Sequence, residues 1–146
     1  MFEIYNSNNK IPENRYLEMN DILMKDYILR KGLEEYKKRE KIFKGEGFEY
    51  WKSMILNDPN YNIILYILDK KIVAFICYIL MEDSVCLAEI QIIKEYQGKN
   101  DIFRKILNKF LEEKFEKDII QKDRKLFERK ETTEELINYT KSFEVK

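Results

Sequence analysis

One acidic residue, Glu89, lies in the middle of an otherwise uncharged stretch of the chain, Cys86 to Ile93. A carboxylate placed among apolar side chains either finds a partner or shifts its pKa upward. A glutamate tuned in this way is suited to take a proton from an ammonium group, which frees the amine to attack an electrophile. We therefore predict Glu89 as a general base. The alternative is that this face of the strand is partly solvated and Glu89 is an ordinary surface acid.

The chain contains no histidine, and this excludes several kinds of site. Histidine-activated serine and cysteine nucleophiles are ruled out, as are metal sites that need histidine ligands. Proton transfer must use Glu, Asp, Tyr, Lys, Cys or water. The two cysteines, Cys77 and Cys86, are too few for a disulfide framework or a zinc knuckle. We expect them to be buried, unlinked thiols, and we expect no metal.

The charges of the chain are balanced, with 27 Lys+Arg and 27 Asp+Glu in 146 residues. Because phosphate contacts supply most of the affinity of nucleic-acid binders, this balance disfavours a nucleic-acid partner. The longest uncharged apolar run, Ile72 to Met81, is far shorter than the ~20 residues of a membrane span. The N-terminus has no signal-type apolar stretch. We expect a cytoplasmic protein without a membrane partner, folded as one domain over residues 1–146.

The segments before Glu89 predict helices followed by strands. The expected elements are a strand over 2–5, a loop over 6–14, a helix from Asp21 to about Phe43, a helix over 48–56, and strands over 61–68, 71–81 and 85–93. Gly45 and Gly47 end the first helix. The helices carry aromatic residues that either fill the core or frame a pocket, namely Tyr27, Tyr36, Phe48 and Trp51.

The three consecutive strands predict an antiparallel meander, with the middle strand apolar on both faces and so central in the sheet. A turn centred on Asp83 would set Met81 opposite Val85 and Cys77 opposite Glu89. Strict alternation along the third strand would then place four side chains on one face, those of Leu87, Glu89, Gln91 and Ile93.

A helix with one continuous apolar stripe follows, from Ile102 to Phe115. Residues 118–120 predict a further strand, which this helix would bring into parallel pairing. Near the end of the chain, Thr132 and Glu135 fit the capping box of a last helix that runs to about Lys141.

This order of elements, together with the segment Ala88-Glu-Ile-Gln-Ile-Ile-Lys-Glu-Tyr-Gln-Gly-Lys99, resembles the GNAT superfamily of acyl-CoA-dependent N-acetyltransferases. The family motif is a strand ending in an apolar pair, then Gln/Arg-x-x-Gly-x-Gly/Ala, then a helix. Gln97-Gly98-Lys99 lies where that motif begins. Some family members also carry their general base in an Ala-Glu-Ile context on this strand, which agrees with Glu89.

The resemblance implies a site for acetyl-CoA. In the family, unpaired N–H groups and the dipole at the helix N-terminus hold the pyrophosphate, and the pantetheine arm pairs with the preceding strand. The implied cofactor-binding residues are Ile92, Ile93, Gln97, Gly98, Lys99, Asn100, Asp101 and Ile102.

The loop departs from the family motif, because Asn100 and Ile102 replace its second and third small residues. Asp101 also sets a carboxylate near the expected pyrophosphate unless its side chain turns to cap the helix. Backbone donors do not depend on side-chain identity, so binding can survive these changes. The alternative is that Gln97 to Asp101 is a loop with a helix cap and no ligand.

The segment Asn138 to Phe143 resembles a shortened form of the family's Leu-Tyr-x-Lys-x-Gly-Phe ending. In the family this tyrosine protonates the departing CoA thiolate, and a phenol pKa near ~10 lies close enough to a thiol's ~8.5 for that transfer. The resemblance therefore implies Tyr139 as general acid. The alternative is a tyrosine on the apolar face of a terminal helix.

We therefore predict an α+β fold with a GNAT-like mixed, mainly antiparallel sheet and helices on both faces. The implied function is acetyl transfer from acetyl-CoA to a primary amine of a small-molecule or peptide acceptor, without a metal. The rivals are a non-catalytic GNAT-like module that binds CoA weakly or serves as a partner-binding domain, and an unrelated α+β ligand sensor. The family's last two strands are absent here or supplied by a partner chain in a homodimer, or residues 122–130 conceal one of them.

Overall fold

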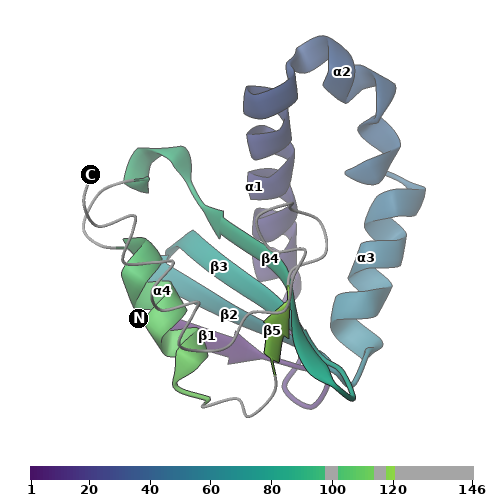
Figure 1. Ribbon diagram of the computed structural model, residues 1–146. Helices are drawn as coiled ribbons and strands as arrows, with labels where there is room; N and C mark the ends of the chain where they lie inside the picture. The colour runs from purple at the N-terminus through teal and green to yellow at the C-terminus, as the bar shows by residue number, and fades with distance from the viewer. Residues whose placement is uncertain (98–101, 114–117, 121–146) are drawn as a thin grey trace.

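The computed structural model describes residues 1–97, 102–113 and 118–120, and its five-stranded sheet is flanked by helices (Figure 1). The strands are β1 (Phe2–Tyr5), β2 (Tyr61–Leu68), β3 (Lys71–Leu80), β4 (Ser84–Ile92) and β5 (Asp118–Ile120). They pair in the order β1-β2-β3-β4-β5, and of these pairs only β4–β5 is parallel. The α+β class and the mixed, mainly antiparallel sheet are confirmed.

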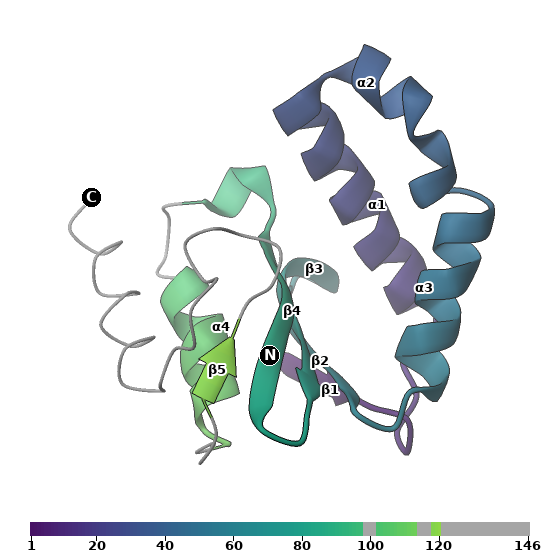
Figure 2. The ribbon, with the colours of Figure 1, turned by 45° about the vertical axis from the view of Figure 1, so that its right-hand side comes forward.

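The helices lie on both faces of this sheet. They are α1 (Glu13–Lys31), α2 (Leu33–Lys38), the 3-10 turn η1 (Glu40–Ile42), α3 (Glu46–Asn57), the 3-10 turn η2 (Lys94–Tyr96) and α4 (Ile102–Leu111). Viewed along the sheet, α4 lies on one side and α1 with α3 on the other, while α2 joins the far ends of α1 and α3 (Figure 2).

The single helix predicted from Asp21 to Phe43 is wrong, because the chain forms three helical pieces there. The first begins eight residues earlier, at Glu13, where Tyr16 and Met19 become buried against the sheet. It ends at Gly32, whose positive φ of 94° suits a residue without a Cβ. Packing against the strands, rather than local periodicity, therefore decides where this helix starts.

Gly47 is not the stop signal that the sequence suggested, because it lies inside α3. A Cβ at this position would stand 2.6 Å from the Ile42 Cα and 2.6 Å from the Lys41 carbonyl oxygen. Glycine is required here because the backbones of η1 and α3 approach so closely. Gly45, with a φ of 78°, precedes α3 and turns the chain into it.

Two apolar clusters fill the space between the helices and the sheet. The α4-side core includes Ile76, Tyr78, Ile106 and Phe110. The α1/α3-side core includes Met19, Ile55, Leu65 and Phe75. Strands β2 and β3 contribute to both cores, so the sheet is buried on both faces as the apolar pattern of β3 predicts.

Candidate functional site

Strand β4 contains a bulge that fixes the position of Glu89. Leu80 pairs with Val85 and Tyr78 with Leu87, yet Cys77 pairs with Glu89, so Ala88 is an extra residue without a partner. The predicted pairing of Cys77 with Glu89 is confirmed. The pairing of Met81 with Val85 is wrong, because the turn is one residue tighter and Met81 N–H donates to the Ser84 carbonyl at 2.9 Å.

The bulge also changes which side chains share a face. Leu87 lies in the α4-side core, whereas Ala88 packs against the α1/α3-side core on the opposite face. Glu89 and Gln91 pair with Cys77 and Phe75 of that second core. The predicted common face of Leu87 with Glu89 and Gln91 is therefore wrong, since one inserted residue reverses the alternation.

Glu89 is half-buried and has a buried hydrogen-bond donor beside it. Gln91 is 6% exposed, and its side-chain amide donates to Glu89 Oε1 at 2.8 Å. This bond orients the carboxylate on the face of β4 that lies toward the α1/α3-side core. The sequence placed Gln91 near Glu89 but offered no sign of its role.

The Glu89 carboxylate lines a cavity of about 220 Å³, which we call the Glu89 cavity. Its other walls are Leu23 from α1, Trp51 and Met54 from α3, Tyr61 from β2, Phe75 and Cys77 from β3, and Ala88 from β4. Of the four aromatic residues considered as pocket or core, Trp51 lines this cavity. Tyr27 and Tyr36 instead pack against Phe43 at tilted angles, with ring centroids 5.4 and 5.9 Å away.

The polar groups of the Glu89 cavity lie close to one another. The Tyr61 hydroxyl interacts with the side chains of Trp51 and Cys77. Burial raises the pKa values of the Tyr61 hydroxyl and the Cys77 thiol well above their ordinary values, so both stay neutral. Cys77 is therefore a poor nucleophile, and the expectation of buried, unlinked cysteines is confirmed for Cys77 and Cys86.

The end of β4 presents main-chain groups away from β3. Ile93 N–H donates to the Val73 carbonyl at 3.0 Å, so the antiparallel alternation directs the groups of Ile90 and Ile92 to the opposite edge. Within the described residues, β5 pairs only with Ser84 to Cys86, which leaves this part of the edge without a described strand partner.

Only the two ends of the predicted phosphate loop are described. Gln97 is exposed, and its Nε2 donates to the Ile92 carbonyl at 3.0 Å. Ile102 begins α4 as predicted, and its side chain is buried in the α4-side core. Gly98, Lys99, Asn100 and Asp101 lie outside the described residues, as do Tyr139 and the last predicted helix.

A larger cleft, of about 1100 Å³, lies between α1 and the end of β4, and we call it the α1–β4 cleft. Gln91, Ile92 and Ile93 line one side of it, and Glu18, Asp21 and Ile22 line the other. Gln91 thus lines the α1–β4 cleft while its amide holds Glu89, which lines the smaller cavity.

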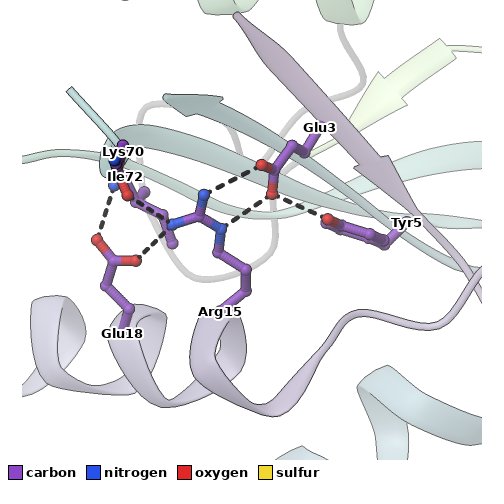
Figure 3. Close-up of polar contacts among 6 residues, drawn as sticks. All are labelled: Glu3, Tyr5, Arg15, Glu18, Lys70 and Ile72. Atoms are coloured by element: carbon purple, nitrogen blue, oxygen red, sulfur yellow. Dashed lines mark hydrogen bonds and ion pairs between the residues drawn. The ribbon is translucent and has the colours of Figure 1, made fainter. Parts of the chain in front are cut away.

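Arg15 anchors α1 at the rim of the α1–β4 cleft (Figure 3). Its guanidinium donates to both carboxylate oxygens of Glu3, at 3.0 and 3.1 Å, to Glu18 at 3.0 Å and to the Lys70 carbonyl at 3.0 Å. Glu18 in turn accepts from Ile72 N–H at 2.7 Å. This network ties β1, α1 and the β2–β3 turn together, and no motif in the sequence signalled it.

In the described parts of the chain, no three His, Cys, Asp or Glu side chains are grouped to hold a metal ion. No helix among the described residues is long and apolar enough to cross a membrane.

Comparison with solved structures identifies the class of fold. An aminoglycoside acetyltransferase from an uncultured soil metagenomic sample, solved with sisomicin, matches with a TM-score of 0.61 over 98% of this chain and 86% of its own, at 14% identity. The PaiA N-acetyltransferase of Thermoplasma acidophilum, solved with coenzyme A, matches with a TM-score of 0.53 over 78% and 74%, at 17% identity. A ribosomal-protein-alanine N-acetyltransferase from Brucella melitensis matches with a TM-score of 0.51 over 83% and 77%, at 11% identity.

The chain therefore has the GNAT fold, and these structural neighbours are acetyltransferases. At these identities the likeness concerns the fold. No protein-family model and no curated protein matches the sequence.

Proposed function

We propose that the protein is an N-acetyltransferase that transfers the acetyl group of acetyl-CoA to a primary amine. The observation that carries this proposal is the position of Glu89. Its carboxylate lines an apolar cavity, accepts a hydrogen bond from buried Gln91, and lies on the strand whose outer edge presents the groups of Ile90 and Ile92. The proposed general base would thus lie on the same strand as backbone positions that suit a pantetheine arm.

Glu89 would act on an acceptor that arrives as an ammonium ion. It takes one proton, directly or through water, and the freed lone pair attacks the thioester carbonyl carbon. The C–S bond breaks, and Tyr139 protonates the thiolate and regains the proton that the nitrogen loses as the amide forms. The products are the N-acetyl amine, the CoA thiol and one proton, which Glu89 releases.

The proposed acetyl-CoA site has two parts. The main chain of β4 near Ile92 would pair with the pantetheine arm. The N–H group of Ile93 would not take part, because it already donates a hydrogen bond to the Val73 carbonyl. The segment from Gln97 to Ile102 would hold the pyrophosphate through backbone donors at the start of α4. Support for this part comes from the family motif and from the buried first residue of α4.

The acceptor would enter through the α1–β4 cleft, which is lined by Gln91, the residue whose amide donates to Glu89 of the Glu89 cavity. The neighbour solved with sisomicin is an aminoglycoside acetyltransferase and another neighbour is named for a ribosomal protein. Both small-molecule and peptide amines are therefore reasonable acceptors to test.

Calorimetric titration with acetyl-CoA tests the cofactor site. We expect sub-millimolar binding by the native chain, and loss of binding when Gln97 to Asp101 is replaced by a serine-rich loop. Replacement of the exposed turn residues Glu82 and Asp83 by serines is the matched control and should leave binding unchanged. The absence of sub-millimolar binding by the native chain would refute the proposal that the protein is an acetyltransferase.

The second candidate is a GNAT-like module that binds CoA weakly or acts as a partner-binding domain. The observation that favours it is the bond from the Gln97 amide to the Ile92 carbonyl, which occupies a main-chain acceptor of the proposed pantetheine site. Binding of acetyl-CoA without turnover on any of a broad set of primary amines would favour this module over the enzyme.

A further inference from the structure

We propose that the acceptor carries an apolar group, aromatic or branched, a few bonds from its amine, and that this group fills the Glu89 cavity. The inference rests on the proposed acetyltransferase function and specifies the substrate class for it. It is argued from the shape, chemistry and size of the cavity.

The Glu89 cavity has a buried base and a half-buried rim. Tyr61, Phe75 and Cys77 form the base and are 2%, 0% and 1% exposed. Side chains of intermediate exposure from α1, α3 and β4 surround them, namely Leu23, Trp51, Met54, Ala88 and Glu89. Such a hollow admits a group from outside, whereas a void sealed within the core would not.

The base offers little to a polar ligand. Phe75 has no polar group, and the Tyr61 hydroxyl already interacts with the side chains of Trp51 and Cys77. A polar ligand group placed here would lose its water without gaining an equivalent partner, which costs free energy. The cavity therefore selects apolar groups.

The cavity volume matches a ring or a branched chain. A cavity of roughly 150 Å³ lined by apolar side chains already binds benzene. The Glu89 cavity, at about 220 Å³, has room for a phenyl group or a branched alkyl group.

Glu89 places a carboxylate directly beside this apolar base. It pairs with Cys77 across β3 and β4, and partners of this kind have Cα atoms about 5.5 Å apart. A ligand that meets both features must carry its ammonium group and its apolar group close together. An arylalkylamine fits this description, whereas a linear diamine would place a second charge in the cavity.

The acyl chain of the donor is the competing occupant. Three of the rim side chains, Leu23, Trp51 and Met54, come from α1 and α3, on the face of the sheet opposite α4. The proposed pyrophosphate site lies at the start of α4. This arrangement favours the acceptor over the donor.

Steady-state kinetics with acetyl-CoA and two amines test the inference. Phenethylamine and ethylamine share the aminoethyl group and differ only in the phenyl ring. We expect kcat/KM for phenethylamine to be higher by at least about tenfold, the discrimination that an apolar pocket supplies. Leu23→Trp should fill the cavity and abolish this preference. Leu33→Trp, at an exposed position of α2 outside the cavity, is the control and should keep it.

The outcomes separate the inference from the function on which it rests. Turnover of both amines with equal kcat/KM would overturn the inference and leave the acetyltransferase intact. The native chain could instead prefer butyryl-CoA to acetyl-CoA and lose this preference in Leu23→Trp. That result would show that the acyl chain of the donor fills the cavity, and it would also overturn the inference. Absence of turnover with every amine would instead contradict the function.

Saturation-transfer NMR with phenethylamine supplies a readout that needs no turnover. The signal should be present for the native chain and for Leu33→Trp, and weaker for Leu23→Trp. If the phenethylamine signal is unchanged in Leu23→Trp, the amine does not bind in the cavity. The same conclusion follows if the native chain gives no signal. Circular dichroism confirms that each variant is folded.

Discussion

At the scale of single residues, Glu89 depends on its neighbours for its position. The bulge at Ala88 places it on the α1/α3 face, and Gln91 holds its carboxylate at 2.8 Å. Glu89 is half-buried and lines a cavity floored by buried Phe75 and Cys77. The role of Glu89 as general base stays a prediction, which a substitution can test.

Glu89→Gln should reduce kcat for acetyl transfer by about 10²- to 10⁴-fold, the range typical of a lost general base. The substitution keeps the size of the side chain and removes its ability to take a proton. Affinity for acetyl-CoA, measured by calorimetry, should stay within about twofold because the cofactor site uses other residues.

The matched control is Glu82→Gln, which makes the same chemical change at an exposed position of the β3–β4 turn. It should retain the native kcat. An unchanged kcat in Glu89→Gln, with the variant shown to be folded, would mean that another group takes the proton.

At the scale of elements, the Arg15 network fixes α1 relative to the sheet. The β2–β3 turn takes positive φ values at Asp69 and Lys70, 50° and 66°, as two-residue hairpins prefer. The Lys70 carbonyl accepts from Arg15, whose guanidinium also holds Glu3. The side chains of Arg15 and Glu3 are 12% and 20% exposed, so the pair is shielded from solvent.

Because of this shielded pair, the free energy of unfolding should depend on pH in the acidic range. Hydrogen bonding to Arg15 holds the pKa of Glu3 below its ordinary 4.5. The ionised carboxylate therefore stabilises the fold fully above its unfolded-state pKa, and this contribution is lost as pH falls through the folded pKa. Glu3→Gln should lower the free energy of unfolding by about 1–2 kcal/mol at pH 7. The difference from the native chain should shrink below pH 4.5, measured by urea titration.

Glu40→Gln provides the comparison for this experiment. Glu40 pairs with Lys44 at 3.2 Å, but both side chains are well exposed, 47% and 63%. Removal of such an exposed pair should leave the stability close to that of the native chain. Equal effects of the two substitutions at pH 7 would contradict the structural role of the Arg15 network.

At the scale of the whole molecule, one sheet joins the two apolar cores. Ile76 and Tyr78 of β3 belong to the α4-side core, while Phe75 and Cys77 of the same strand belong to the α1/α3-side core. Because neighbouring residues of one strand belong to both cores, a substitution that destabilises one core should also destabilise the other.

Phe110→Ala tests this coupling. Phe110 is fully buried on α4 and meets the Tyr78 ring edge-on, with centroids 5.1 Å apart. Its truncation should cost about 3–5 kcal/mol. The fluorescence of Trp51, the chain's single tryptophan, reports on α3 on the opposite face. Its urea transition should shift as far as the circular dichroism transition.

Asn108→Ala, at an exposed position of the same helix, should leave both transitions within about 0.5 kcal/mol of the native values. A Phe110→Ala variant whose Trp51 transition stays in place while the circular dichroism changes would show that the two cores unfold independently.

Much of the sheet was predictable because its signals are local. Tyr61 to Leu68 and Lys71 to Leu80 are runs of β-branched and aromatic residues, separated by a two-residue turn. The parallel pairing of residues 118–120 with β4 was predictable because one amphipathic helix connects the two strands. The helix starting at Glu13 was missed, because its first turns are stabilised by contacts of Tyr16 and Met19 with the distant sheet.

For the candidate site, the sequence by itself determined which residue types are available. It named Glu89 and the segment around Gln97, and the absence of histidine excluded histidine-dependent catalysis and metal binding. Only the tertiary structure decided where Glu89 points and what surrounds it. The bulge at Ala88 depends on the register with β3, and the cavity depends on Leu23 and Trp51 arriving from separate helices. Such relations join residues far apart along the chain, so local periodicity cannot encode them.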